Sequence, residues 1–93
     1  MDNIELLDQK EKKMLIKEGQ ALLKLIISKG YTPYSFSKKA MYSNSRLYKI
    51  IRGECDITSI KVYNAFIFSK LLGYEKIDDM YDALGIDVLK DLN

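Results

Sequence analysis

Two short helices that follow each other closely in the sequence constrain the possible fold of this chain more than any other feature. Thr32-Pro33 starts the first, since threonine is a favoured N-cap residue and the missing N–H of proline would have no partner at the first helical position. This helix is expected to end near Met41. Ser43 caps the second helix, which is expected from about Asn44 to Arg52, before Gly53. The stretch Thr32 to Gly53 is therefore predicted to form helix, turn and helix.

This stretch has an apolar side and a basic side. It holds five basic residues and no Asp or Glu, whereas residues 54–93 hold eight acids against four lysines. A basic segment beside an acidic one indicates a local site for a polyanion, although a solvated basic face without a partner has the same pattern. The residues expected to face inward are Phe36, Ala40, Tyr42, Leu47, Ile50 and Ile51.

The rest of the chain predicts further helices and no strand, in a single domain over residues 1–93. Apolar residues at three- and four-residue intervals predict one long helix before Gly30, after a short lead-in and an N-cap formed by Asp8 with Glu11. Gly19 within it permits either a close helix crossing or a slight bend. The later helices are expected at about 58–72, capped by Asp56 or Thr58, from Ile77, and over Ile86–Leu92.

The helix at about 58–72 is apolar over much of its circumference, which predicts that it is the central and most buried helix. Ile4, Leu6 and Leu7 near the N-terminus could either pack back on the domain or form part of a dimer contact.

Composition argues against several classes of protein. Cys55 is the single cysteine and there is no histidine, so neither an intramolecular disulfide nor a structural zinc site is expected, and we interpret Cys55 as a bystander. No signal peptide or membrane span is apparent, which favours a reducing cytoplasm. No glycine-rich phosphate loop or nucleophile with a base is present, so we expect no catalytic residue, cofactor or small-molecule substrate. Abundant Lys, Ile and Tyr are typical of an AT-rich bacterial or phage genome.

From Gly30 to Gly53 the sequence resembles the helix-turn-helix of the phage-repressor and Cro-like (XRE) family. A typical member has Gly, one apolar residue, Thr, a short helix, a turn, and a second helix that ends in Gly. Here this frame begins with Gly30-Tyr31-Thr32, and the family's small residue at the helix crossing falls on Ser37. The resemblance covers about residues 22–81. It implies an all-α, five- to six-helix lambda-repressor-like DNA-binding domain.

Two positions depart from the family pattern. Met41 stands where the family usually has a glycine in the turn, so either the turn is rebuilt or Met41 bears the strain of a left-handed backbone. Pro33 replaces the glutamine that often contacts a phosphate there.

In such a motif the second helix lies in the major groove with its N-terminal residues nearest the base edges. Some of the residues also have structural explanations: Asn44 could only support the helix start, Tyr48 could pack on the motif, and Lys38 and Lys39 could be solvated. The residues expected to contact bases are Asn44, Ser45, Tyr48, Lys49 and Arg52. Those expected to contact phosphates are Tyr34, Ser35, Lys38, Lys39, Ser43 and Arg46.

The expected function is therefore a sequence-specific, double-stranded DNA-binding transcriptional regulator. One such helix reads few bases, so a homodimer on a palindromic operator is expected, with a dimer surface from the N-terminal segment or from Ile86–Leu92. The acidic C-terminal part and the missing turn glycine leave an alternative: a protein-interaction module on the same fold, such as an antirepressor or an inhibitor of a nucleic-acid enzyme.

Overall fold

The computed structural model describes residues 2–86 of the chain, and the side chains of residues 12–86. Every regular element in this range is helical, which confirms the all-α class. None of the helices described is long and apolar enough to cross a membrane. The elements are α1 (Asp2–Ser28), α2 (Pro33–Ala40), α3 (Asn44–Ile51), a 3₁₀ turn η1 (Ile57–Ser59), α4 (Val62–Leu71) and α5 (Ile77–Ala83).

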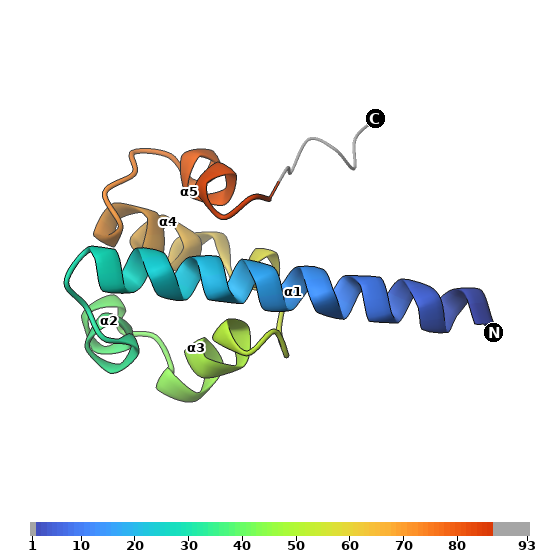
Figure 1. The fold of residues 1–93 in the computed structure, drawn as a ribbon. Helices are drawn as coiled ribbons and strands as arrows, with labels where there is room; N and C mark the ends of the chain where they lie inside the picture. Colours follow the sequence, from blue (N-terminus) through green and yellow to red (C-terminus); the bar gives the residue numbers. More distant parts are fainter. Residues whose placement is uncertain (1, 87–93) are drawn as a thin grey trace.

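The long helix α1 is the centre of the arrangement. It runs across the molecule with α2 and α3 on one side and α4 and α5 on the other, and its N-terminal part extends beyond them (Figure 1). Leu22 and Ile26 of α1 are fully buried. Helix α4 instead leaves Val62, Tyr63 and Phe66 exposed, so the prediction that the helix at about 58–72 is the central, most buried one is wrong.

Helix α1 also begins earlier than predicted. It is helical from Asp2, so the lead-in and the N-cap at Asp8 are wrong. No proline or glycine interrupts residues 2–8, and Glu5, Leu6 and Leu7 are good helix formers, so the helix continues through the Asp8–Glu11 pattern. The predicted contacts of Ile4, Leu6 and Leu7 lie outside the described side chains.

Gly19 marks the place where α1 crosses the end of α3. A Cβ atom at Gly19 would lie 2.4 Å from the carbonyl oxygens of both Ile50 and Ile51. Of the two roles expected for this glycine, the close helix crossing is the one found. Gly53, with φ +79°, also sits close to α1, where a Cβ would lie 2.7 Å from the backbone nitrogen of Ile16.

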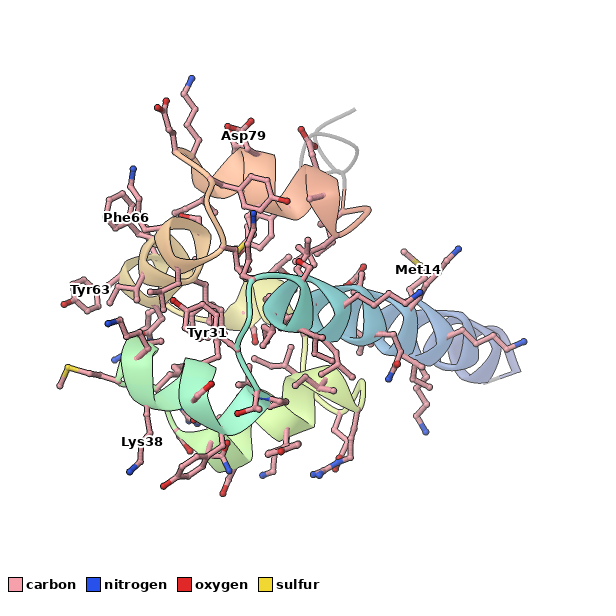
Figure 2. All side chains as sticks on the ribbon, turned by 60° about the vertical axis from the view of Figure 1, so that its left-hand side comes forward. Met14, Tyr31, Lys38, Tyr63, Phe66 and Asp79 are labelled. Carbon is pink, nitrogen blue, oxygen red and sulfur yellow. The ribbon has the colours of Figure 1, made fainter. Side chains whose placement is uncertain are left out.

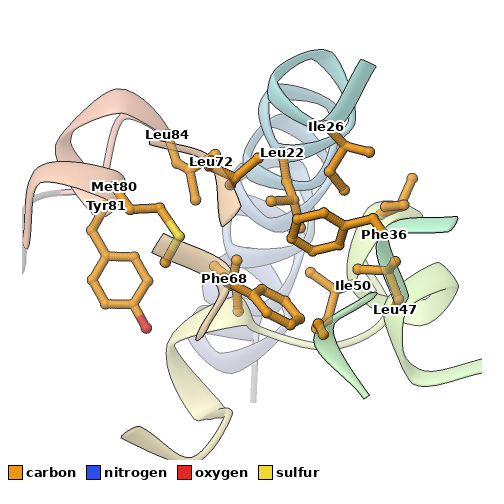
Figure 3. Close-up of a cluster of buried hydrophobic side chains, with 13 residues drawn as sticks. Leu22, Ile26, Phe36, Leu47, Ile50, Phe68, Leu72, Met80, Tyr81 and Leu84 are labelled. Carbon is orange, nitrogen blue, oxygen red and sulfur yellow. The ribbon is translucent and has the colours of Figure 1, made fainter. Parts of the chain in front are cut away.

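One hydrophobic core joins all five α-helices (Figure 3). Its middle is aromatic, with the ring centroids of Phe36 and Phe68 5.0 Å apart in an edge-to-face arrangement. Tyr42 packs edge-on against the same Phe68 at 5.1 Å, and Tyr31 against Phe36 at 5.6 Å. Phe68 of α4 thereby anchors both α2 and the turn after it.

The segment after Gly53 differs from the prediction of a single helix from about residue 58. Asp56 does act as a cap, with its Oδ1 accepting from the Thr58 backbone N–H at 2.9 Å, but it caps only the 3₁₀ turn. Ile57 is fully buried, and Ile60 and Lys61 are extended, so α4 starts at Val62.

The last described helix, α5, starts at Ile77 as predicted, with Asp78 and Asp79 in its first turn. Gly85 follows it with φ +81°, in keeping with the break expected there. Residues 87–92 of the predicted helix over Ile86–Leu92 lie outside the described residues.

Candidate nucleic-acid interface

Helix α2 begins with a capping box built from Thr32 and Ser35. The Ser35 backbone N–H donates to Thr32 Oγ1 at 3.1 Å, and the Thr32 backbone N–H donates to Ser35 Oγ at 2.9 Å. Pro33 occupies the first turn as predicted. The backbone N–H and the hydroxyl of Ser35 therefore both take part in the capping box. A phosphate bound by Ser35 would compete with these hydrogen bonds.

The turn after α2 is made by Met41 in the left-handed conformation, with φ 54° and ψ 42°. The Tyr42 N–H donates to the Ser37 carbonyl at 2.9 Å and the Met41 N–H to the Lys38 carbonyl at 3.1 Å, which closes the helix end as a glycine would. The Met41 side chain is 92% exposed. Of the two possibilities raised by this substitution, the turn is retained and Met41 bears the strain.

Helix α3 is fixed at its first turn by two side chains. Ser43 caps it, its Oγ accepting from the Arg46 backbone N–H at 3.3 Å. Asn44, the first helical residue, is half-buried, and its Oδ1 lies 3.2 Å from Ser37 Oγ on α2. The Ser37 hydroxyl also contacts the Tyr34 carbonyl at 2.8 Å, and it is itself buried where the two helices meet.

The predicted inward set of this region is confirmed. Tyr42 is half-buried and packs on the core, and the other five members are buried: Phe36, Ala40, Leu47, Ile50 and Ile51. All but one of the predicted contact residues are exposed on the remaining surface; Asn44 is the half-buried exception. The exposed ones are Tyr34, Ser35, Lys38, Lys39, Ser43, Ser45, Arg46, Tyr48, Lys49 and Arg52.

Arg52 differs from the other cations of this surface. Its Nε forms an ion pair with a carboxylate oxygen of Glu54, two residues further on, and both side chains are about half exposed. An exposed pair of this kind is weak, about 0–1 kcal/mol, so it can be exchanged for another anion. No other ion pair is found among the side chains of residues 12–86. Lys38 instead lies 5.0 Å from the centre of the Tyr34 ring.

Lys61 is not among the residues that the sequence predicted to contact DNA. With the start of α4 displaced to Val62, Lys61 lines a shallow hollow of about 380 Å³ together with Arg46 of α3. Because a helix was expected from residue 58, the sequence did not predict that Lys61 and Arg46 would line the same hollow. The hollow also contains Tyr42, whose pKa is raised from its usual value, chiefly by burial, against an opposing effect of the nearby Arg46.

Lys38 of α2 and Asp79 of α5 lie on different sides of the molecule. Figure 2 shows Lys38 directed away from the body below α2, whereas Asp79 of α5 lies at the opposite end. The interface candidate is thus a basic surface formed by α2, the turn and α3, with Asp79 of α5 turned away from it.

Comparisons with protein-family models, curated proteins and solved structures returned no match to this chain.

Proposed function

We propose that this chain is a sequence-specific, double-stranded DNA-binding transcriptional regulator of the phage-repressor and Cro-like type, with a lambda-repressor-like fold, acting as a homodimer. The observation that carries the proposal is the α2–α3 pair. Its inner side is buried, and its outer side carries basic and hydrogen-bonding side chains without an acid between Thr32 and Gly53.

Helix α3 suits the major groove in shape and chemistry. An α-helix with its side chains is roughly 10–12 Å across, close to the width of that groove in B-DNA. Ser45, Tyr48 and Lys49 are exposed on it, and lysine can donate to guanine O6 and N7. The first two turns of such a helix approach the base edges most closely, so these side chains are the proposed base contacts.

Asn44 can share this role while bonded to Ser37. The bond uses one acceptor site on Oδ1 and leaves both amide N–H groups to donate. Because Ser37 fixes the side chain before DNA arrives, Asn44 loses little conformational entropy on binding.

Arg52 is better suited to a phosphate than to a base. It lies at the C-terminal end of α3 and is paired with Glu54, so a phosphate would have to replace that carboxylate. Lys38, Lys39 and Arg46 are the other proposed phosphate contacts, and Lys61 is added to them because it shares the hollow with Arg46. These contacts supply affinity, register and salt dependence without choosing the sequence.

The test is a selection of binding sites from random duplexes, followed by fluorescence anisotropy titrations. The proposal predicts enrichment of a palindrome with half-sites about one helical turn, roughly 34–36 Å, apart. The double variant Lys38→Glu, Lys49→Glu should lose binding, while the matched variant Lys24→Glu, Lys76→Glu, with exposed lysines outside the α2–α3 pair, should bind more strongly than that variant. Absence of any binding by the unaltered protein at low salt would overturn the proposal.

The apolar outer face of α4 supports a second candidate, a protein-interaction module on the same fold. Val62, Tyr63 and Phe66 are exposed on that face. A stoichiometric complex with another protein, together with no retention of DNA, would favour this candidate over the first.

A further inference from the structure

Helix α4 has an apolar face that no part of the described chain covers. Val62 is 75% exposed, Tyr63 74% and Phe66 48%, and their spacing places them on one side of the helix. Ala65 and Phe68 on the other side are buried in the core. Figure 2 shows Tyr63 and Phe66 directed outward, away from α1. We name Val62, Tyr63, Phe66 and Lys70 the α4 face.

The charged residues of α4 and the segments next to it in the sequence are of one sign. The segment from Lys61 to Tyr74 contains Lys61 and Lys70 and no acid. Lys70 lies with its Nζ 5.3 Å from the centre of the Phe66 ring, so this cation already associates with an aromatic side chain. A matching surface must therefore offer apolar and aromatic groups with a partner for an ammonium group.

We propose that the α4 face binds a second copy of this chain, with the two α4 helices antiparallel about a two-fold axis at Phe66. Lys70 follows Phe66 by four residues and Val62 precedes it by four, so in this arrangement Lys70 lies opposite the partner's Val62 and beside the partner's Tyr63. The Tyr63 ring is a suitable partner for the ammonium group, and Val62 packs on the aliphatic stem of the lysine.

The charges of this arrangement weaken it without preventing it. The two copies of Lys70 are separated by roughly 12 Å along the helix axis, because each lies four residues from the two-fold axis at a rise of 1.5 Å per residue. Lys70 and the partner's Lys61 lie only about one residue apart along the axis, so these two cations repel each other. The apolar and aromatic groups of the α4 face are complementary to their copies in an isologous contact.

In a dimer formed through the α4 face, both α2–α3 pairs could face the same DNA duplex. In Figure 2, Tyr63 and Phe66 point to the side, whereas Lys38 points downward. A two-fold axis that runs along the Lys38 direction therefore leaves both α2–α3 pairs facing the same way. The choice of a second copy rests on the proposed function, since reading two half-sites requires two recognition helices on one side.

The proposed interface is small, because each copy contributes only one face of one helix. A stable dimer usually buries about 800 Å² on each partner, so we expect a weak dimer that DNA strengthens. Sedimentation velocity up to about 1 mM protein should show reversible dimers, which Phe66→Glu abolishes. Ile27→Glu, at an exposed isoleucine on α1, is the matched control and should leave association unchanged.

Cross-linking tests the contact between the two α4 faces without introducing a charged residue. In a Cys55→Ser background, Phe66→Cys should be joined to its copy by a short bis-maleimide, whereas Ile27→Cys should not. A protein that stays monomeric and a Phe66→Cys variant that cross-links no more than Ile27→Cys would overturn the proposal. So would dimers that persist in Phe66→Glu, or efficient cross-linking at Met14→Cys of α1 instead.

The DNA readout separates this proposal from the proposed function. Phe66→Glu should retain affinity for a single half-site and lose at least tenfold on the palindrome. If the unaltered protein dimerises through Phe66 but binds no DNA, the interface stands and the proposed function fails.

Discussion

The hydroxyl of Ser37 on α2 lies 3.2 Å from the Oδ1 of Asn44, the first residue of α3. Ser37 is buried, Asn44 is half-buried, and the bond joins the two helices across the turn made by Met41. It therefore fixes the start of α3 where the proposed base contacts begin.

Removing this hydroxyl should affect both stability and DNA binding. Ser37→Ala is expected to lower the free energy of unfolding by about 1 kcal/mol, the usual net value of one hydrogen bond. It should also weaken DNA binding, because Asn44 is then free to turn. Urea unfolding and anisotropy titrations measure the two effects. Ser28→Ala, which removes an exposed hydroxyl bonded to the Leu25 carbonyl, is the control, and an equal effect there would contradict this role.

The strained turn should be improved by glycine. Met41→Gly removes a left-handed L-residue conformation that costs roughly 1–2 kcal/mol, against a loss of roughly 0.5–1 kcal/mol from the greater freedom of glycine in the unfolded chain. We expect a gain of about 0.5–1 kcal/mol in urea unfolding, since the exposed side chain makes little contact. Met14→Gly, inside α1, should instead destabilise by about 1 kcal/mol. A destabilised Met41→Gly protein would mean that the methionine side chain has another role.

The close crossing of α1 and α3 should not accept a methyl group. Gly19→Ala would place its Cβ 2.4 Å from the carbonyl oxygens of Ile50 and Ile51, so α3 must move. Although alanine favours a helix by about 1 kcal/mol, we expect a net loss of about 1–3 kcal/mol from overpacking. Thermal unfolding measures it, with exposed Gln20→Ala as the control. Unchanged or raised stability of Gly19→Ala would show that the two helices are not in contact there.

The stability of the fold should depend on the charge of Glu18. Burial, and next the Asp56 carboxylate, raise the pKa of this carboxyl in the folded protein. The folded state therefore binds the Glu18 proton more tightly than the unfolded state, and the ionised carboxylate opposes folding at neutral pH. Glu18→Gln should be more stable than the unaltered protein at pH 7, and the difference should disappear below about pH 4, where both folded and unfolded Glu18 are protonated.

Urea unfolding across this pH range checks the prediction. Glu75→Gln, at an exposed carboxylate before α5, should show no such difference. A Glu18→Gln variant that is less stable at pH 7 would contradict the argument.

Local signals predicted the α2–α3 pair well. Thr32 and Ser43 cap their own helices, and the spacing of Phe36, Ala40 and Leu47 follows from helical geometry alone. Neither signal depends on a distant part of the chain, which is why the bounds of these helices agree closely with the structure.

Cap-like residues were misleading elsewhere because a cap shows only that a helix can start. Asp8 and Glu11 have the capping pattern inside a continuous helix, and Asp56 caps a 3₁₀ turn of three residues rather than α4. The bond between Ser37 and Asn44, and the contact of Gly19 with Ile51, depend on how helices meet in three dimensions. Apolar composition likewise did not reveal that α4 keeps Val62 and Tyr63 exposed.

The most direct test of the central claim compares Lys49→Ala with Lys38→Ala on a selected duplex and on a scrambled one. We predict that Lys49→Ala loses about 1–3 kcal/mol per half-site, or roughly 5- to 150-fold for each, on the selected duplex and much less on the scrambled one. Lys38→Ala should weaken binding to both alike and reduce the slope of log K against log salt concentration by about 0.9 for each bound copy. An equal loss on both duplexes for Lys49→Ala, or no loss on either, would contradict the placement of α3 in the major groove.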